Sequence, residues 1–340
     1  MGVISSSSQA VRAATVQDVA RMAGVSAMTV SRVINTPALV HADTASRVHA
    51  AIDATCFVPN MLAGGLKSKR SRLIAAIVPS LASPVFSATV DALTSALADA
   101  GYHLMVGQSG YDQEAEDALL RALMGRRPDG FVLVGVDHSL KARMHLKASG
   151  VPVVETWDLT PEPVDMLVGF SHVAAGAAVC RYLQGRGRRS LAVITASDER
   201  AMRRAHAFAA AARDAGLVAP TVIQVDAPAT MGDGRRALQQ LLAQNGDVDG
   251  LFCSSDMLAL GVLVEAVHRN VPVPERISVV GFGDLGFAGD TEPALTSVRV
   301  DGHRIGNEAA RCIVHRLENP GAVSLRTLDV GFSIVERASA

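Results

Sequence analysis

The sequence predicts an α/β core of two parallel-sheet subdomains, preceded by a small all-α domain. Two short segments with helical apolar spacing, joined by a glycine, lie within residues 15–35. From Leu73 onward, short apolar runs alternate with segments of helical periodicity as far as residue 282. The length of 340 residues is sufficient for more than one buried core.

The first two helices have clear start and end signals. The first is expected over residues 16–23, with an apolar stripe made of Val16, Val19, Ala20 and Ala23. Gly24 ends it, and Ser26 is a favourable N-cap for a second helix that buries Val30, Val33 and Ile34. Two short helices joined by a tight turn form a helix-turn-helix, whose second helix enters the major groove of DNA.

A third helix and a weak fourth segment follow. The third is expected over residues 40–56, with Val40, Val48, Ala51 and Ile52 facing the first two helices. Pro59 interrupts the chain, because proline disfavours helix at the preceding residue. Residues 61–67 include Gly64 and Gly65, each of which costs a helix roughly 1 kcal/mol relative to alanine. So short a helix is expected to be unfolded in isolation.

From residue 73 the pattern is that of βαβ units. The expected strands are residues 73–78, 103–107, 131–136, 151–155, 191–195, 221–225, 251–255 and 277–282. The expected helices are residues 86–100, 113–124, 140–149, 173–184, 201–215, 234–244 and 256–269. This alternation predicts mainly parallel sheets with helices on both faces, and domain size favours two Rossmann-like sheets over one.

Positive charge is concentrated at the start of the chain. Residues 1–72 contain eight Lys and Arg against three Asp, whereas the rest contains 24 Lys and Arg against 30 acidic residues. A basic head can neutralise phosphates while an acidic body is repelled by them. Together with the helix-turn-helix, this distribution favours DNA binding over a basic tail without a partner.

Several other classes of protein are not favoured. No apolar run approaches the length of a membrane span, and the first residues lack the apolar core of a signal peptide, so a cytoplasmic protein without a membrane partner is expected. The four cysteines are far apart and predict neither a metal site nor a disulfide framework. No catalytic constellation is present, so an enzyme is not expected.

One glycine motif suggests a dinucleotide site but lacks the context for it. Residues 281–286 read GFGDLG and follow an expected strand. The dinucleotide fingerprint also requires a helix that opens at the third glycine, and Gly289 and Pro293 break any such helix. NAD binding is therefore not expected, and no cofactor is predicted.

The order of these elements resembles the lactose-repressor family of bacterial transcription regulators, from Thr15 to about Arg337. The residues that carry the resemblance are DVARMAGVSAMTVSRVIN, FVPNMLAGGLKS, IAAIVPSLASPVF, VPVVETWD, GRGRRSLAVI, SSDMLALGV, VPERISVVGFGD and LTSVRVD. The stretches PSLASPVF, VPVVE followed by VGFSHVAAGA, and LDVGFS are similar to the gluconate-utilisation repressors within that family.

The resemblance implies a domain organisation and partners. It implies a DNA-binding domain over 15–58, a hinge helix and linker over 59–71, and a periplasmic-binding-protein-like core over 72–340, while the Ser-rich residues 1–14 are expected to form a disordered tail. Within the core, it implies one subdomain of about 72–170 with 301–328, and another of about 171–299 with 329–337. The implied partners are palindromic operator DNA, a second copy of the chain in a homodimer, and a small effector bound between the subdomains.

Residues that contact DNA are also implied by the resemblance. The implied base-reading residues are Ala27, Met28 and Arg32, and the implied phosphate contacts are Thr15, Ser26, Thr29, Ser31 and Asn35. In the hinge segment they are Asn60, Ala63, Leu66 and Lys67, with Leu66 inserted into the central base step. Thr29 and Asn35 have an alternative role in capping and turn formation. Gly64, Gly65 and Ala45 depart from the family pattern.

The implied effector site lies beyond the carboxyl ends of the strands. Its residues are Ser80, Ser83, Phe86, Tyr111, Asp158, Ser171, Arg200, Arg204, Ser255, Asp256 and Asp284. Two arginines on one helix face suit a carboxylate, which indicates a sugar acid such as gluconate. For two residues another role is weighed: Asp256 as a helix N-cap helped by Ser255, and Arg200 as a solvated side chain.

Alternatives remain open at this point. The same repressor mechanism with 2-ketogluconate, 6-phosphogluconate or a neutral sugar fits the sequence, and Gly283, where many family members have Asp, removes one hydroxyl acceptor. A solute-binding protein or a sugar-metabolising enzyme on the same core is a more distant alternative. The missing export signal and the basic head disfavour the first, and the missing catalytic residues disfavour the second.

Overall fold

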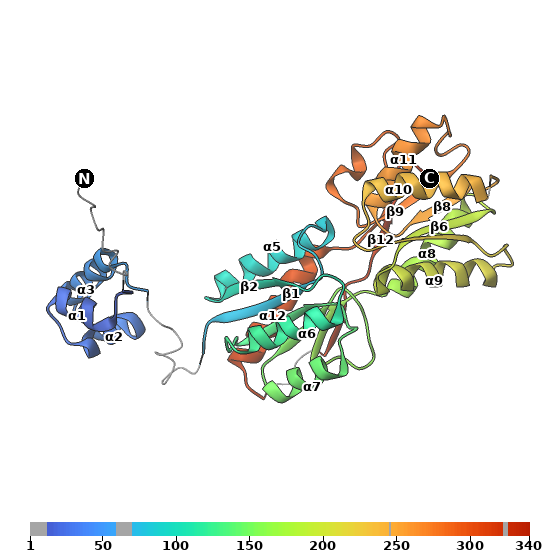
Figure 1. Ribbon diagram of the computed structural model, residues 1–340. Coiled ribbons are helices and arrows are strands. Elements are labelled where there is room, and N and C mark those ends of the chain that lie inside the picture. Colours follow the sequence, from blue (N-terminus) through green and yellow to red (C-terminus); the bar gives the residue numbers. More distant parts are fainter. Residues whose placement is uncertain (1–11, 59–69, 245, 322–325) are drawn as a thin grey trace, which may run out of the picture. The chain divides into compact units, whose positions relative to one another are not determined.

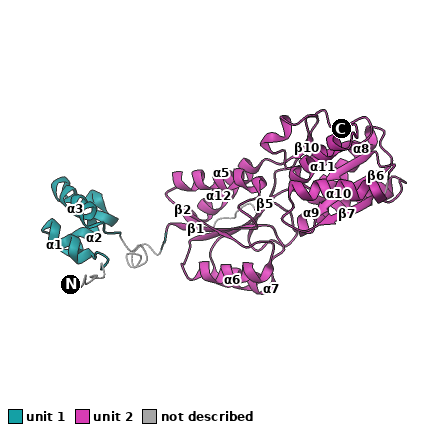
Figure 2. Cartoon of the chain, turned by 45° about the horizontal axis from the view of Figure 1, so that its top comes forward, with its two compact units in different colours: residues 1–71 teal, residues 72–340 magenta. Residues whose placement is uncertain are grey.

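The computed structural model describes residues 12–58, 70–244, 246–321 and 326–340. The chain divides into two compact units, residues 1–71 and 72–340, which Figure 2 colours separately. The predicted fold class is confirmed: a helical unit is followed by two six-stranded α/β sheets.

The first unit is a three-helix bundle consisting of α1 (Val16–Ala23), α2 (Ala27–Asn35) and α3 (Ala42–Thr55), with a short 3₁₀ turn, η1 (Pro37–Leu39), before α3. Thr15 caps α1 in a reciprocal arrangement with Asp18, and Gly24 ends it in the left-handed conformation that glycine adopts readily. The small core contains Val19, Val30, Val33, Val48 and Ala51.

The first subdomain of the second unit is built on sheet A, whose strand order is β11-β5-β4-β3-β1-β2. Its strands are β1 (Leu73–Val78), β2 (His103–Gln108), β3 (Gly130–Val134), β4 (Val153–Thr156), β5 (Met166–Gly169) and β11 (Thr327–Asp329), all paired in parallel. Helices α5 (Pro84–Asp99) and α12 (Gly302–Glu318) cover one face, and α6 (Gln113–Met124) and α7 (Leu140–Ser149) cover the other (Figure 1).

The second subdomain is built on sheet B, whose strand order is β12-β10-β9-β8-β6-β7. Its strands are β6 (Leu191–Ala196), β7 (Thr221–Val225), β8 (Gly250–Cys253), β9 (Ser278–Phe282), β10 (Thr296–Arg299) and β12 (Ser333–Val335), with β12 antiparallel to β10. Helices α8 (His172–Gly185) and α9 (Glu199–Asp214) cover one face, and α10 (Met231–Gln244) and α11 (Asp256–His268) cover the other. A 3₁₀ turn, η2 (Gly286–Gly289), follows β9.

Several elements of the structure are not predicted from the sequence. They are β5 in the first subdomain and β10, α12, β11 and β12 near the end of the chain. After β10 in sheet B, the chain returns to sheet A at β11 and then to sheet B at β12. The strands among them have only three or four residues, which is too short for an alternation of apolar and polar residues to be recognised. Helix α12 was detectable, because Ile305, Ala309, Cys312 and Ile313 are buried at helical spacing.

Helices α8 and α9 touch backbone to backbone at Gly176. A Cβ atom at this position would overlap the carbonyl oxygen of Arg204. A larger residue would therefore separate the two helices, and the glycine fixes Arg204 on α9 relative to the start of α8.

Within the described residues, no helix is long and apolar enough to cross a membrane. In the same part of the chain, no group of three or more His, Cys, Asp and Glu side chains is placed to hold a metal ion.

Candidate functional site

A cavity of about 300 Å³ lies between the two subdomains. Its walls come from loops and helix starts at the carboxyl ends of strands in both sheets, which is where ligands bind in open parallel sheets. The first subdomain contributes residues that follow β1, β2 and β4. The second contributes residues that follow β6, β7, β8 and β9. A ligand in this cavity therefore contacts both subdomains at once.

Seven of the eleven predicted effector residues line this cavity: Ser80, Ser83, Phe86, Tyr111, Arg200, Arg204 and Ser255. They come from four separate loops and helices, so their convergence depends on the tertiary fold. Ser255 also caps α11 by accepting a hydrogen bond from the backbone N–H of Leu258 (3.3 Å).

Two of the predicted residues outside the cavity have hydrogen-bond partners within the protein. Ser171 is the N-cap of α8, and its hydroxyl accepts from the backbone N–H of Ala174 (3.0 Å). Asp158 is almost fully buried, and its carboxylate accepts hydrogen bonds from Leu159 N (2.7 Å) and from Arg203 (2.6 Å). Neither side chain lines the cavity, and their roles in effector binding stay predictions.

Two further predicted carboxylates, on Asp256 and Asp284, also lie outside the cavity. Asp256 is fully buried and accepts hydrogen bonds from the Ser297 hydroxyl (2.6 Å) and from Leu285 N (2.7 Å). Asp256 is the first residue of α11. The sequence suggested Asp256 as the N-cap of this helix, but the N-cap is Ser255. Burial raises the pKa of Asp256 to about 6.

The Asp284 carboxylate is bridged by two arginines of the same subdomain. Its oxygens lie 2.5 Å from Arg299 Nε and 2.7 Å from Arg337 Nη2. The family resemblance implies this residue as a ligand contact, and in the structure the two arginines neutralise its charge.

Arg204 is the group in the cavity wall that is best suited to bind an anion. Its guanidinium is buried, donates to the carbonyl oxygen of Ser254 (2.8 Å) and to His172 Nδ1 (2.9 Å), and lies 3.8 Å from the centre of the Phe282 ring. Its Nε is buried and has no hydrogen-bond partner in the described part of the chain. Burial lowers the pKa of Arg204 to about 10, so the group stays cationic at neutral pH.

His172 positions this guanidinium as a neutral acceptor. Its Nε2 lies 2.8 Å from the carbonyl oxygen of Trp157, which can only accept, so Nε2 carries the proton. Its Nδ1 therefore accepts from Arg204. Burial, and then the positive charge of Arg204, lower the pKa of His172 well below its ordinary value. Arg204 forms no ion pair with the described residues, although the nearby carboxylates of Asp198 and Asp158 favour its charged form.

Aromatic rings form the apolar part of the wall. Phe86 and Trp157 pack edge to face with centroids 5.3 Å apart, and the Trp157 indole N–H donates to the Thr89 hydroxyl (3.0 Å). Arg200 lies over the Phe86 ring at 5.4 Å and also donates to the carbonyl oxygen of Val134 (3.2 Å). Rings of this kind can pack against the carbon face of a sugar while polar groups bind its oxygens.

Sequence reasoning missed several residues of the cavity wall, namely Trp157, His172, Asp198, Thr230 and Phe282. The signal for them was their position, because each lies at or within a few residues of the carboxyl end of a strand or at the start of the helix that follows. Two of them directly adjoin predicted residues, Trp157 beside Asp158 and His172 beside Ser171.

Arg203 joins the two subdomains across the edge of the cleft. It extends from α9 to Asp158, after β4, and to Asp137, after β3, and it also lies 3.5 Å from Glu199 one turn earlier on its own helix. We call Arg203, Asp137 and Asp158 the cross-cleft clasp. Arg203 is not among the residues that line the cavity, whereas Arg200 and Arg204 of the same helix line it.

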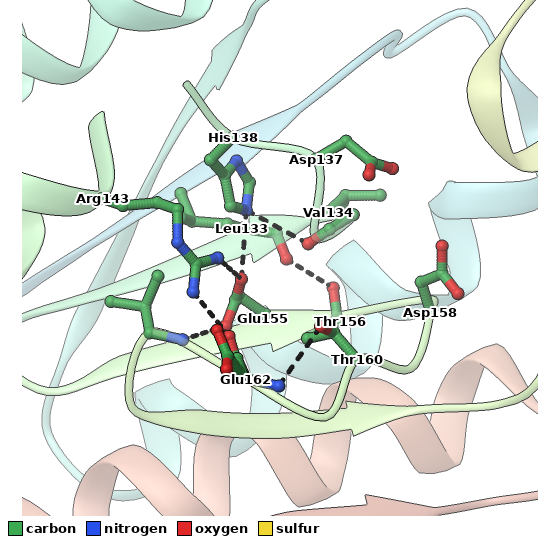
Figure 3. Close-up of polar contacts among 12 residues, drawn as sticks. Leu133, Val134, Asp137, His138, Arg143, Glu155, Thr156, Asp158, Thr160 and Glu162 are labelled. Carbon is green, nitrogen blue, oxygen red and sulfur yellow. Dashed lines mark hydrogen bonds and ion pairs between the residues drawn. The ribbon is translucent and has the colours of Figure 1, made fainter. Parts of the chain in front are cut away.

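A second buried cluster lies behind the clasp, around His138 and Glu155. Figure 3 shows His138 and Arg143 both directed at the Glu155 carboxylate. The Nδ1 of His138 lies 2.6 Å from Glu116 Oε1, and its Nε2 lies 3.2 Å from the carbonyl oxygen of Gly135. Both ring nitrogens face groups that only accept, so the ring is doubly protonated.

The charge of His138 predicts a pH-dependent contribution to stability. Burial alone lowers the pKa of His138, but the hydrogen bond and charge of Glu116, with the charge of Glu155, raise it above the ordinary value of 6.5. A raised pKa in the folded state stabilises the fold below the unfolded-state pKa, and this stabilisation is lost as the pH rises through the folded-state pKa. His138→Gln should therefore lower the free energy of unfolding by roughly 2–4 kcal/mol at about pH 6 and by clearly less at about pH 9.

Urea unfolding of the two proteins at both pH values measures this difference. His206→Gln, at an exposed position on α9, is the matched control and should leave the free energy of unfolding nearly unchanged at either pH. A destabilisation by His138→Gln that does not depend on pH would mean that the ring is neutral.

The predicted DNA-reading residues lie on one exposed surface of the first unit. Ala27, Met28, Ser31 and Arg32 are exposed on α2, and the Arg32 guanidinium has no ion pair with the described residues. Ser26 caps α2 through the backbone N–H of Thr29 (3.1 Å). The alternative local roles of two residues are also present: Thr29 bonds the Ser26 hydroxyl (2.9 Å), and Asn35 donates to the carbonyl oxygen of Ser31 (2.8 Å).

Thr15 is half-buried and is held by Asp18 within the capping arrangement of α1. The predicted hinge contacts, Asn60, Ala63, Leu66 and Lys67, lie outside the described residues.

Two family models match the chain. Residues 15–60 match the model of bacterial regulatory proteins of the lacI family, and residues 180–340 match a periplasmic binding protein-like domain.

Similar proteins cover nearly the whole length. The regulator GntR of Pseudomonas aeruginosa is 37% identical over 96% of this chain and 95% of its own length. GntR of Escherichia coli K12 is 30% identical over 94% of this chain and 96% of its own length. A solved structure of a lacI-family transcriptional regulator from Silicibacter pomeroyi covers 96% of this chain and 99% of its own, with a TM-score of 0.91 at 32% identity. A lac repressor dimer bound to operator has the same fold, with a TM-score of 0.81 at 24% identity over 96% of this chain and 99% of its own.

Proposed function

The chain belongs to the lacI family of bacterial transcription regulators, and from this premise we propose that it represses genes of sugar-acid catabolism and leaves its operator when gluconate binds. The family consists of DNA-binding regulators with an effector-binding domain and not of enzymes. The observation that carries the effector proposal is the buried Arg204 guanidinium, which lines the cavity and forms no ion pair with the described residues.

The chemistry of the cavity supports a sugar acid. A planar guanidinium binds a carboxylate through two parallel hydrogen bonds, and desolvation strengthens such bonds. Ser80, Ser83 and Ser255 supply hydroxyl groups near the aromatic rings, which suits a ligand with several hydroxyls and an apolar carbon face. The similarity to two GntR regulators over nearly the whole chain agrees with this class of ligand.

The proposed assembly is a cytoplasmic homodimer on a palindromic operator. A two-fold dimer places two recognition helices on two half-sites, which lets one short helix serve a long site. In the proposed mechanism, effector binding changes how the two subdomains are closed around the cleft and thereby lowers the affinity for operator. The predicted hinge segment, residues 59–67, is the part of the chain through which this change would act.

The coupling can be tested through its reciprocity. If gluconate weakens operator binding by some factor, operator must weaken gluconate binding by the same factor, which for allosteric proteins is about 5–150-fold. Calorimetric titration of the full chain with gluconate, with and without an operator selected from random DNA, measures this factor. Equal gluconate affinities in the two titrations would refute the proposed release mechanism.

A thermal-shift panel tests the choice of effector. Gluconate should stabilise the chain, and 2-ketogluconate, 6-phosphogluconate and neutral sugars are the alternatives to be compared with it. Stabilisation by neutral sugars alone would refute the carboxylate role of Arg204.

A further inference from the structure

A second cavity, of about 460 Å³, adjoins the first at the edge of the cleft. The two cavities share three wall residues, Tyr111, Asp198 and Arg200. We call the first the basic chamber, after Arg204 and Arg200, and the second the acidic chamber. A ligand that occupies the basic chamber and extends past Arg200 enters the acidic one.

The two chambers differ sharply in charge. Five carboxylates line the acidic chamber, on Asp112, Glu116, Asp137, Asp198 and Glu199. Its cationic groups are Arg200 and the doubly protonated His138, and His138 is already engaged with Glu116 and Glu155. The clasp arginine, Arg203, donates a hydrogen bond to Asp137 and partly offsets the charge of that carboxylate. The lining of the acidic chamber therefore keeps an excess of negative charge, whereas that of the basic chamber has an excess of positive charge.

The places in the acidic chamber where an anion would normally bind are already filled. Two helix N-termini point into this region, those of α6 and α9, and such termini ordinarily attract phosphate. The Asp112 carboxylate accepts from the backbone N–H groups of Glu114 (2.8 Å) and Ala115 (3.3 Å) of α6. The Asp198 carboxylate accepts from Ala201 N of α9 (3.1 Å). Both termini are thus neutralised by the protein's own carboxylates.

We infer that the acidic chamber holds the uncharged, hydroxyl-bearing end of the effector and selects against any sugar acid that carries a second anionic group. Carboxylates accept hydrogen bonds from sugar hydroxyls but repel phosphate and carboxylate. A doubly anionic ligand is disfavoured in either orientation, because only one of its charged ends can lie in the basic chamber. This inference rests on the proposed sugar-acid effector, and it separates gluconate from 6-phosphogluconate.

The first measurement compares ligands on the unmodified full chain. Titration calorimetry at low ionic strength, near pH 7, should show gluconate binding at least about tenfold more tightly than 6-phosphogluconate or glucarate, since the phosphate carries nearly two charges there. The preference should shrink as salt is added, because the chamber is open to solvent and its charges are screened.

The second measurement changes the charge of the chamber. Asp137→Asn removes one carboxylate and frees part of Arg203, which keeps Asp158 as a partner, and should improve 6-phosphogluconate binding relative to gluconate by about tenfold. Glu199→Gln, at a mostly exposed side chain, should act in the same direction by about threefold. The matched control is Asp214→Asn, an exposed acid at the far end of the same helix, which should leave the ratio of affinities unchanged.

The outcomes separate this inference from the proposed function. Equal or tighter binding of 6-phosphogluconate by the unmodified chain overturns the role of the acidic chamber and leaves the sugar-acid proposal standing. A preference for gluconate that neither Asp137→Asn nor Glu199→Gln alters overturns it as well. If no sugar acid binds, the effector proposal itself fails and this inference fails with it.

Discussion

Arg204→Met is expected to lower gluconate affinity by at least about a hundredfold while operator binding persists. The guanidinium is desolvated, and the loss of one partner from a buried charged pair costs about 2–5 kcal/mol. Operator binding should persist because the helix-turn-helix lies in a separate compact unit with its own core. Calorimetry with gluconate and fluorescence anisotropy with operator measure the two effects, and the operator complex should no longer dissociate when gluconate is added.

Two further variants make this result interpretable. Arg213→Met changes an exposed arginine in the last turn of the same helix and should leave gluconate binding as it is. Arg204→Lys keeps the charge but loses the planar fork, so an affinity between those of the original chain and Arg204→Met is expected. Urea unfolding shows whether the variants are folded. Unchanged gluconate binding by folded Arg204→Lys and Arg204→Met would assign the carboxylate to another group.

The second large effect is expected at the recognition helix. Arg32→Ala should weaken binding to the selected operator by about ten- to a hundredfold and change binding to unrelated DNA much less. A bidentate contact between arginine and guanine contributes about 1–3 kcal/mol of discrimination. Arg32 is exposed on α2 and has no ion pair among the described residues that would hold it away from DNA.

A phosphate contact would behave differently from a base contact. Arg21, exposed on α1 and 3.4 Å from Asp18, is the matched comparison. If Arg21→Ala has an effect, it should weaken binding to operator and unrelated DNA equally and reduce the salt dependence. Anisotropy titrations on both DNAs separate the two cases. An equal loss on both DNAs for Arg32→Ala would place Arg32 at the backbone instead of at a base.

Local signals made the helix-turn-helix predictable. Gly24 follows one apolar stripe and predicts the end of a helix, and Ser26 precedes the next stripe and predicts the start of another. In the structure, α1 ends and α2 begins at these residues. Alternating apolar runs likewise predicted two parallel sheets. The three- and four-residue strands β5, β11 and β12 carry too little local pattern, and their pairing is determined by distant parts of the chain.

The candidate site was less predictable, because a carboxylate's partner is not visible in the sequence. Asp158 follows a strand, and in the sequence nothing shows that its carboxylate has a partner. In the structure, Arg203, 45 residues later, donates a hydrogen bond to it. The Asp256 carboxylate accepts a hydrogen bond from the hydroxyl of Ser297, 41 residues later. Trp157 and His172 were overlooked because neither is a typical sugar-oxygen ligand, although their contacts with one another and with Arg204 shape the wall.

The backbone contact at Gly176 determines how rigid the anion receptor is. Because α8 and α9 touch there, His172 and Arg204 belong to one body whose order is established during folding and not by the ligand. A preorganised receptor loses little conformational entropy when it binds, which favours tight binding of a small, flexible ligand. The carboxylate affinity that we propose would therefore depend in part on Gly176, a residue without a side chain that lies outside the cavity wall.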